Sequence, residues 1–454
     1  MHRDVRRRRY LQGLAVAGAA GIAGCGGDTP GGDEEDDPES TAPPPATETD
    51  PRTADRVTTE TETTETPEES EGTAQLQALH VQASGDYRAA MTALFDGFET
   101  AHPDVSVAED TGRRNVEAVV RNRLESGDPP GTWLDWPGAS LTPYRDDLGA
   151  IEGGVWDEAT AAAYPPELRR LVRSDGEYVA VPIYVHRVNN LFYNTAVVER
   201  AGVDPGALST PEDLLDAFAA VAAETDAAPL SHPTVGWTTV QLWETVLLGQ
   251  AGPEGYEAFV AGEGDRAAVE SALETLTDYR EFYPADASSV AFPEANARVT
   301  NGDAAFIQQG DWAASAYRAD NGFEYGEDWG RIPFPGTDGS YLLNVEAFVH
   351  PDPNPTPEAT TAFLAYCAGP AAQRRYSRVR GSVPPRTDVD LGEYPAFQRD
   401  QYGDYRSASA RPPSIIHGLA VESSVADSIT EALVAFAEGT DVGTTADALL
   451  AAFE

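Results

Sequence analysis

The chain has 454 residues, of which 75 are acidic and 31 basic, and its formal net charge is −44 at pH 7. All basic residues are arginine, since the sequence contains no lysine. A field this negative repels a phosphate backbone, which excludes nucleic acid from the expected partners. Hydrophobic residues make up 41% of the chain, so most of it can fold around a buried core.

The charge is distributed unevenly along the chain. Residues 1–25 carry +4 and residues 26–75 carry −14, which leaves −34 for residues 76–454. Self-repulsion of this size destabilises a compact chain at low salt, whereas at about 1 M salt the Debye length falls to roughly 3 Å. The acidic, lysine-free composition therefore favours a protein of a halophile, with compositional drift as the alternative.

Residues 1–25 have the organisation of an export signal. RRRRYLQ at 6–12 is followed by a short, weakly apolar stretch and by the letters IAGC, which end at Cys25. A basic head, a short apolar segment and small residues are typical of a secretory signal, and the paired arginines resemble a twin-arginine signal. The letters before Cys25 resemble a lipobox, which predicts a lipid anchor on Cys25. An accidental cysteine after an apolar run is the alternative.

Residues 26–75 consist almost wholly of Gly, Asp, Glu, Pro, Thr, Ser and Ala. Such a segment has nothing to bury and repels itself, so we expect a disordered acidic tether. Together the two segments predict a protein that is exported, anchored on the extracellular face of the cell membrane and held away from it.

Alternating strand and helix patterns begin at residue 76. Strands are predicted at 76–81, 105–107, 178–185 and 189–194. Helices are predicted where apolar residues recur on one helical face, in the first case at i, i+3, i+4 and i+7. The third predicted helix, near 423–437, is taken as the last one. The apolar faces are Met91, Leu94, Phe95 and Phe98; Val116, Val119, Val120 and Leu124; and Val425, Ile429, Leu433 and Phe436.

Two helix starts share a Thr-Pro-Glu signal, at Thr210 and at Thr356. A threonine cap, a proline in the first turn and acids behind it favour a helix N-terminus at both places. The second helix carries Cys367, which we expect to be a buried small residue rather than a reactive thiol. Strands alternating with helices over this length predict an α/β protein with two lobes.

Motifs of known catalytic or metal chemistry are missing. The sequence has no HExxH, GxSxG, P-loop or Rossmann glycine pattern, and its seven histidines lack metal-ligand spacing. No catalytic residue, metal or cofactor is therefore predicted. Six tryptophans instead lie in or near predicted loops, and tryptophan beside acid, amide and imidazole groups suits a carbohydrate; they are Trp133, Trp136, Trp237, Trp243, Trp312 and Trp329. Core packing is the alternative for each of them, above all for Trp243.

Several segments resemble the extracellular solute-binding proteins of ABC importers, in the carbohydrate branch that includes maltose- and glucose-binding proteins. YVAVPIYVHRVNNLFYN at 178–194 resembles that family's crossing strand, and NGDAAFIQQGDWA at 301–313 resembles its GDW segment. GSVPPRTDVD at 381–390 and PPSIIHGLA at 412–420 resemble segments of the glucose-binding subgroup. The resemblance covers nearly all of residues 76–454 in the same order.

The resemblance implies the two-lobed type II fold of periplasmic binding proteins, with a hinge and a ligand cleft between the lobes. The first lobe would comprise residues 76–185 and about 345–385, and the second residues 186–344 and about 386–454. The implied function is to capture a neutral mono- or oligosaccharide by lobe closure and deliver it to a membrane permease. We expect a monomer with no enzymatic activity.

The resemblance also implies the site residues. Asp311 of the GDW segment would bind sugar hydroxyls with Trp312 beside it, and His417 matches a ligand histidine of the glucose-binding subgroup. The other implied positions are a stacking tryptophan, a first-lobe tryptophan, two residues at the cleft floor and two on the return crossing; these are Trp237, Trp136, His186, Arg187, Asn344 and Glu346. A structural role is the alternative, notably a turn at Asp311 and pairing at His186 and Arg187.

One loop departs from the family pattern. Relatives often carry an aromatic residue in the first loop, where this chain has Gln82, and Tyr87 is the candidate to replace its stacking surface. Two other functions stay open. One is an anchored extracellular glycan hydrolase using two carboxylates, and the other is a receptor of the same fold for another solute, such as a peptide or glycerol phosphate. The negative field disfavours an anionic ligand.

Overall fold

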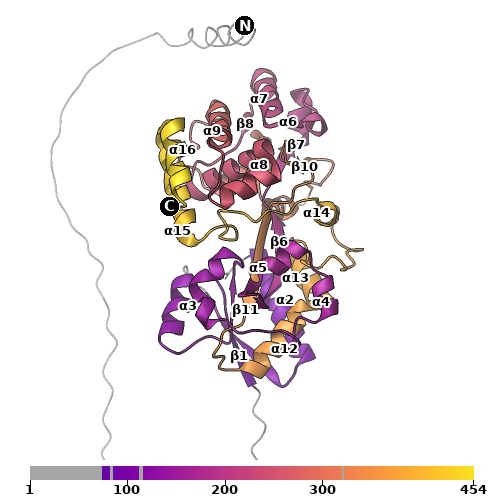
Figure 1. The fold of residues 1–454 in the computed structure, drawn as a ribbon. Coiled ribbons are helices and arrows are strands. Elements are labelled where there is room, and N and C mark those ends of the chain that lie inside the picture. Colours follow the sequence, from indigo (N-terminus) through magenta and orange to yellow (C-terminus); the bar gives the residue numbers. More distant parts are fainter. Residues whose placement is uncertain (1–73, 82–84, 112–115, 320–321) are drawn as a thin grey trace, which may run out of the picture. The chain divides into compact units, whose positions relative to one another are not determined.

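A computed structural model of the protein describes residues 74–81, 85–111, 116–319 and 322–454 (Figure 1). The predicted export signal, Cys25, almost all of the predicted tether and Gln82 lie outside the described residues. Within the described part, no helix combines the length and the apolar composition needed to cross a membrane. The described residues build two larger sheets, each with its own helices and hydrophobic core, and a two-stranded sheet of β4 and β5.

The first lobe is built on a five-stranded sheet in the order β2-β1-β3-β11-β6. β1 pairs in parallel with β2 and β3, whereas β11 is antiparallel to β3 and β6. The strands are β1 Ala74–Leu79, β2 Val105–Asp110, β3 Thr132–Asp135, β6 Ala180–Arg187 and β11 Leu343–Val349. The longer helices of this lobe are α2 Gly85–Ala101, α3 Val116–Glu125, α12 Pro357–Ala368 and α13 Pro370–Arg380. Short elements complete it: η1 Ala139–Asp147, α4 Glu158–Ala162, α5 Pro166–Leu171, β4 Arg173–Ser174 and β5 Glu177–Tyr178.

The second lobe is built on a four-stranded sheet in the order β10-β7-β9-β8. Its strands are β7 Asn190–Asn194, β8 Ala228–Leu230, β9 Ala304–Gln309 and β10 Trp329–Pro333. Helices of this lobe come between and after the strands: α6 Thr195–Arg200, η2 Pro205–Ala207, α7 Pro211–Glu224, α8 Gly236–Val260, α9 Arg266–Arg280, α10 Phe292–Asn301, η3 Asp311–Ala313, α11 Ala314–Ala319, α15 Ser423–Glu438 and α16 Val442–Ala451.

Hydrophobic patterning accounts for most of these elements. The predicted helix faces are confirmed, since Met91, Leu94 and Phe98 of α2 have no exposed surface. All eight residues of β6 are buried, as expected for a strand covered on both faces. The pattern at 178–185 is split between β5 and β6, and α15 is not the last helix because α16 follows it. Cys367 is buried as predicted, and burial raises the pKa of its thiol.

Three of the six tryptophans predicted in or near loops are core residues instead. Trp133 lies in β3, Trp243 in α8 and Trp329 in β10, and none is more than 1% exposed. The loop prediction was wrong there because neighbouring Gly, Pro and Asp residues also flank short buried elements. The alternative of helix packing for Trp243 is confirmed.

The two lobes meet where the chain crosses between the sheets. Asn189, between β6 and β7, donates to Thr337 Oγ1 at 2.8 Å and to the Ser340 carbonyl at 3.1 Å, and its Oδ1 accepts from the Leu342 amide at 2.9 Å. One side chain thus joins the outgoing crossing to the return crossing. Since each of these bonds is buried, they fix the two crossings against each other.

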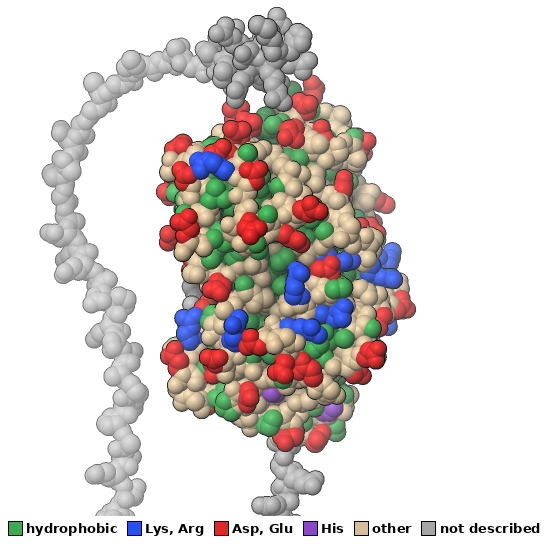
Figure 2. Space-filling model, viewed as in Figure 1, with side chains coloured by type: hydrophobic (Ala, Val, Ile, Leu, Met, Phe, Trp, Pro, Cys, Tyr) green, Lys and Arg blue, Asp and Glu red, His purple; other side chains and the backbone are tan. Residues whose placement is uncertain are grey.

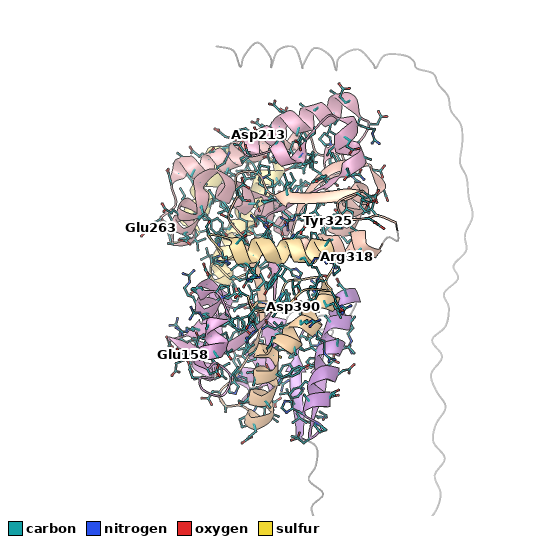
Figure 3. All side chains as sticks on the ribbon, turned by 90° about the vertical axis from the view of Figure 1, so that its right-hand side faces the viewer. Glu158, Asp213, Glu263, Arg318, Tyr325 and Asp390 are labelled. Atoms are coloured by element: carbon teal, nitrogen blue, oxygen red, sulfur yellow. The ribbon has the colours of Figure 1, made fainter. Side chains whose placement is uncertain are left out.

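A third connection passes through α14 Ala396–Ser407, which lies between the two lobes in both ribbon views (Figures 1 and 3). Phe397 belongs to a hydrophobic cluster of the second lobe, whereas Tyr402 and Tyr405 belong to the core of the first. Core side chains of the first lobe therefore continue past residue 385, where the sequence placed its last boundary.

The acidic surplus is a property of the surface. Figure 2 shows acidic side chains spread over the visible face, with arginines gathered towards its middle. Among the described acidic residues, those buried are Glu244 and Asp311. These two therefore need a separate explanation, because an acid is rarely buried without partners.

The two Thr-Pro-Glu helix starts behave differently, which gives a matched test of capping. Thr210 accepts from the Asp213 amide at 3.2 Å, and the Asp213 side chain returns to the Thr210 amide, completing a capping box. Thr356 makes no side-chain cap bond. We expect Thr210→Ala to lower the free energy of unfolding by about 1 kcal/mol and Thr356→Ala by less, measured by urea denaturation in molar salt. Equal losses would contradict the capping assignment at Thr210.

Candidate ligand-binding site

The base of the candidate site is one face of the β6–β11 pair. His186 lies opposite Asn344, and Tyr184 lies opposite Glu346, so these four side chains share a face of the sheet. Next to Glu346 the register slips by one residue, where Ala347 pairs with Pro182. Proline cannot donate to the ladder, and a bulge at this point redirects the neighbouring side chains.

The second lobe supplies Asp311 and Trp312 from η3, which follows β9. The Asp311 carboxylate bonds to His186 Nδ1, although the two residues belong to different sheets. Trp312 contacts the His186 ring edge-on, with centroids 5.5 Å apart, and its Nε1 donates to Gln309 Oε1 at 3.2 Å. A Cβ at Gly310 would collide with the Trp312 ring, so glycine is required there.

A chain of aromatic and imidazole rings extends from His186 to the surface. His417 contacts Trp312 at 5.4 Å between centroids and Trp136 at 5.8 Å. Trp136 follows β3 and is 37% exposed, whereas His417 is 8% exposed. We call Trp136, His417, Trp312 and His186, with Asp311, the ring cluster. It brings together five of the residues predicted for the site.

Both imidazoles of the ring cluster are neutral at pH 7. Burial lowers the pKa of His186 despite the Asp311 carboxylate beside it. Burial, with the neighbouring His186, lowers the pKa of His417 to about 3. A neutral imidazole carries one N–H and one acceptor nitrogen, so His186 donates from Nδ1 to Asp311 and keeps Nε2 as an acceptor.

Several buried polar atoms around the ring cluster have no hydrogen-bond partner within the described residues. An unpaired buried polar atom costs about 1–3 kcal/mol, so a group of them needs an explanation, and a polar ligand is one that could supply the missing partners. On or next to the cluster they are His186 Nε2, Asp311 Oδ2, Gln309 Nε2, Asn344 Oδ1, Gln241 Oε1, Tyr376 OH, Arg318 Nη1 and Arg380 Nε. They include both donors and acceptors, as the hydroxyl groups of a sugar require.

A tyrosine cluster of the first lobe adjoins His186. Tyr184 contacts the His186 ring at 4.9 Å and stacks on Tyr376 at 5.6 Å. Tyr87 donates to Glu346, and Arg380 lies over the rings of Tyr87 and Tyr184. Burial raises the pKa of Glu346, while the tyrosine hydroxyls oppose that shift.

Tyr87 does not offer a stacking face in this structure. Its side chain is 4% exposed, and its ring contacts with Tyr184 and Tyr376 are edge-on. The Tyr87 hydroxyl donates a hydrogen bond to Glu346, so Tyr87 holds Glu346 in place and does not itself line the site. The suggestion that Tyr87 replaces the missing first-loop aromatic is therefore not supported by this geometry.

Arg187 and Trp237 lie apart from the ring cluster. Arg187 donates to Asn189 Oδ1, Asp404 Oδ2 and the Ser340 carbonyl, so its guanidinium is engaged by the protein. It alternates with His186 on β6 and points to the opposite face of the sheet. Trp237 starts α8 and contacts the Phe292 ring at 5.7 Å. Gln241, one helical turn further on, binds both Gln308 and Gln309.

Sequence reasoning missed other residues near the cluster. Tyr184 could have been found from the strand period, since it lies two residues before His186 on the same face. Arg318 could not, because it is brought in by α11 and its guanidinium lies against Gly381 of the other lobe. An open hollow of about 530 Å³ on the first lobe shares no residue with the ring cluster; it is lined by Gln77, Asp110, Val119, Asn122, Arg123 and Asp128.

Comparison with known proteins decides the family. The family model for bacterial extracellular solute-binding protein matches residues 93–401. The chain is also 39% identical to the xylose/arabinose-binding protein XacG of Haloferax volcanii, over 99% of this chain and 97% of the relative. The protein belongs to the extracellular solute-binding protein family.

More distant members of the solute-binding protein family also match. An uncharacterised ABC transporter extracellular-binding protein of Pyrococcus horikoshii is 28% identical over 86% of this chain and 90% of its own. The solved bacterial solute receptor AcbH has a TM-score of 0.73 at 16% identity, over 84% of this chain and 98% of its own. This structural match confirms the predicted two-lobed type II fold. These relatives are described as binding proteins and receptors, not as enzymes.

Proposed function

We propose that this protein captures a neutral mono- or oligosaccharide between its two lobes and delivers it to the permease of an ABC importer. The observation that carries the proposal is the group of unpartnered buried polar atoms beside Trp312 and His186. Sugar hydroxyls both donate and accept hydrogen bonds, and the apolar face of a sugar ring packs on an aromatic side chain.

The roles of individual residues follow from their positions. Asp311 Oδ2 and His186 Nε2 accept from sugar hydroxyls, and Asn344 Oδ1 accepts from a third. Trp312 and Trp136 supply ring surface, and His417 lies between them. Since both imidazoles are neutral, they add no charge to the site, which is compatible with a ligand without charge.

The relatives support a sugar as the ligand. The Haloferax volcanii protein is named for binding xylose and arabinose, and a relative from Rhizobium meliloti, 27% identical over 78% of this chain, is named a probable sugar-binding periplasmic protein. Pentoses and hexoses are thus the first candidates. A carboxylate in the site and the acidic surface argue against glycerol phosphate or another anion.

The N-terminal segments and the composition complete the proposal. The twin-arginine signal exports the folded chain, Cys25 carries the lipid anchor, and the acidic tether spaces a monomeric receptor from the membrane. The acidic, lysine-free body is an adaptation to molar salt. The family relation supports this arrangement, because a soluble receptor must remain near its permease.

A thermal-shift screen of neutral sugars in molar salt tests the ligand class. The panel should contain xylose, arabinose, glucose, galactose and short oligosaccharides, with a dipeptide and glycerol phosphate as the competing classes. A ligand present at a hundred times its dissociation constant stabilises the folded state by about 2.7 kcal/mol. At least one sugar is expected to raise the melting temperature, and a shift with only the peptide or the phosphate would replace the sugar by another solute.

A further inference from the structure

Glu244 is a buried acid that has no role among the proposed sugar-binding residues. It lies in α8, has no exposed surface and is one of the two acids buried in the described part of the chain. The other is Asp311, which belongs to the ring cluster. Glu244 therefore also needs an explanation, since burying a carboxyl group costs free energy unless hydrogen-bond partners compensate for the lost water.

Two hydrogen-bond partners of Glu244 belong to the segment that carries His417. Its Oε2 accepts from the Ile415 amide at 2.7 Å, and its Oε1 accepts from Ser414 Oγ at 2.7 Å. Ser414 Oγ in turn lies 2.8 Å from His417 Nδ1. A continuous chain of three hydrogen-bonding groups thus runs from Glu244 through Ser414 to the imidazole.

Tyr256 closes the far side of the Glu244 site. Helix α8 is broken at Gly252, whose φ of 70° only glycine adopts readily, and the second half of α8 brings Tyr256 back against Glu244. The Tyr256 hydroxyl lies 2.9 Å from Glu244 Oε2 and 2.9 Å from the Pro413 carbonyl. Oε2 therefore accepts from a backbone amide that cannot reverse, and Oε1 accepts from Ser414. The Tyr256 hydroxyl has one hydrogen and donates either to Oε2 or to the Pro413 carbonyl.

The direction of this hydrogen-bond chain sets which nitrogen of His417 carries the proton. Ser414 has a single hydroxyl hydrogen, so it donates either to Glu244 or to His417 but not to both. When it donates to the Glu244 carboxylate, His417 Nδ1 must donate to Ser414 and the neutral ring has its acceptor at Nε2. We infer that Glu244 is a positioning residue, which through Ser414 fixes His417 as the Nδ1–H tautomer and presents Nε2 as an acceptor to a ligand hydroxyl.

The ligand hydroxyl in this inference rests on the proposed sugar-binding function, whereas the tautomer does not. Within the described residues His417 Nε2 has no protein partner, and the ring lies between Trp136 and Trp312. An acceptor at this point complements His186 Nε2 and Asp311 Oδ2. Three acceptors in one site favour a ligand that presents several O–H donors, as a sugar does.

The donor and acceptor roles along the hydrogen-bond chain from Glu244 through Ser414 to His417 can reverse near neutral pH. Burial raises the pKa of Glu244 to about 7, against the opposing effect of its hydrogen-bond donors. A proton added to Glu244 goes to Oε1, because Oε2 already accepts the Ile415 amide. Oε1–H then donates to Ser414, Ser414 donates to His417 Nδ1, and the imidazole hydrogen lies on Nε2. The titratable groups that face Glu244 are Tyr256 and, through Ser414, His417, which itself faces His186.

Nitrogen NMR of the ligand-free, full-length protein tests the inference. In ¹⁵N-histidine protein at pH 9, His417 is expected to show the Nδ1–H tautomer, and Glu244→Gln is expected to convert it to the Nε2–H tautomer. The glutamine oxygen must accept from the Ile415 amide, so its NH₂ group donates to Ser414 and reverses the chain. Comparison with His417→Asn assigns the signal.

The control variant is Glu257→Gln, which removes the same charge from an exposed position on α8 and should leave the His417 tautomer unchanged. If Glu244→Gln does not fold, the wild-type protein still decides, because at pH 9 the ionised Glu244 requires the Nδ1–H tautomer of His417. An Nε2–H tautomer in wild type at pH 9, or the same tautomer in wild type and Glu244→Gln at pH 9, overturns the inference. Neither outcome depends on a ligand, so failure of the sugar screen and failure of this inference are separate results.

Discussion

Asp311→Ala is expected to abolish ligand-induced stabilisation of the protein. Asp311 is 1% exposed, holds His186 through one carboxylate oxygen and has the other unpartnered beside the ring cluster. The substitution removes an acceptor of the ligand and also releases the imidazole that supplies a second one. A hydrogen bond to a charged group contributes about 1.5–3 kcal/mol and one to a neutral group about 0.5–1.5 kcal/mol, so the two losses weaken binding by about thirtyfold or more.

The measurement is the sugar-induced change in melting temperature, compared with the melting temperature of the ligand-free variant. Asp303→Ala is the matched control, since Asp303 is exposed at the other end of β9 and the same charge is removed. Asp311→Asn should retain part of the binding, because an amide oxygen can still accept from His186. If Asp311→Ala lost stability but bound sugar like wild type, Asp311 would be a structural turn residue.

Asp404→Ala is expected to destabilise the folded protein by about 2–4 kcal/mol, because it leaves two buried guanidiniums without their shared acid. Asp404 Oδ2 accepts from Arg187 at 2.8 Å and also from Arg331. Burial and the neighbouring Arg331 lower the pKa of Arg187 to about 10. The expected loss is nearer the lower value because the Asp404 side chain is 38% exposed and solvent screens it.

Urea denaturation in molar salt measures this effect. Asp400→Ala is the control, because Asp400 lies one turn earlier in α14, is exposed and bonds to Tyr325 alone. The two variants change the net charge equally, so a difference between them reports the buried pairs. Equal free energies of unfolding for the two variants would show that Asp404 does not hold the arginines. Loss of sugar binding in Arg187 variants without loss of stability would return Arg187 to the ligand site.

Positions that a family motif or a helical repeat specifies could be predicted well from the sequence. His186 and Asn344 were placed on two crossings by resemblance, and the structure makes them cross-strand partners in the β6–β11 ladder. The apolar faces of α2 and α15 followed from helical periodicity alone, since the same side chains are buried, apart from Val425, which is partly buried. Local signals sufficed there because a buried face repeats with the period of its element.

Contacts that depend on tertiary geometry could not be predicted. Nothing local in the sequence indicates that Glu244 meets Ser414, 170 positions later, or that Arg187 is covered by Asp404. Tyr87 was proposed as a stacking residue because the first loop lacks the aromatic residue that relatives often carry there. In the structure, however, the Tyr87 hydroxyl donates to Glu346. Whether a polar residue faces a ligand or a protein partner depends on which distant element packs against it, and one sequence does not record that.

The most direct test of the central claim is calorimetric titration of the full-length protein with each neutral sugar in molar salt. Capture of a sugar by one site predicts saturable binding with one sugar molecule per chain for at least one pentose or hexose or a short oligosaccharide, and loss of that binding in Asp311→Ala. The account is contradicted if no neutral sugar binds, or if the sugar that binds does so with the same affinity after Asp311, His186 and Trp312 are each replaced by alanine.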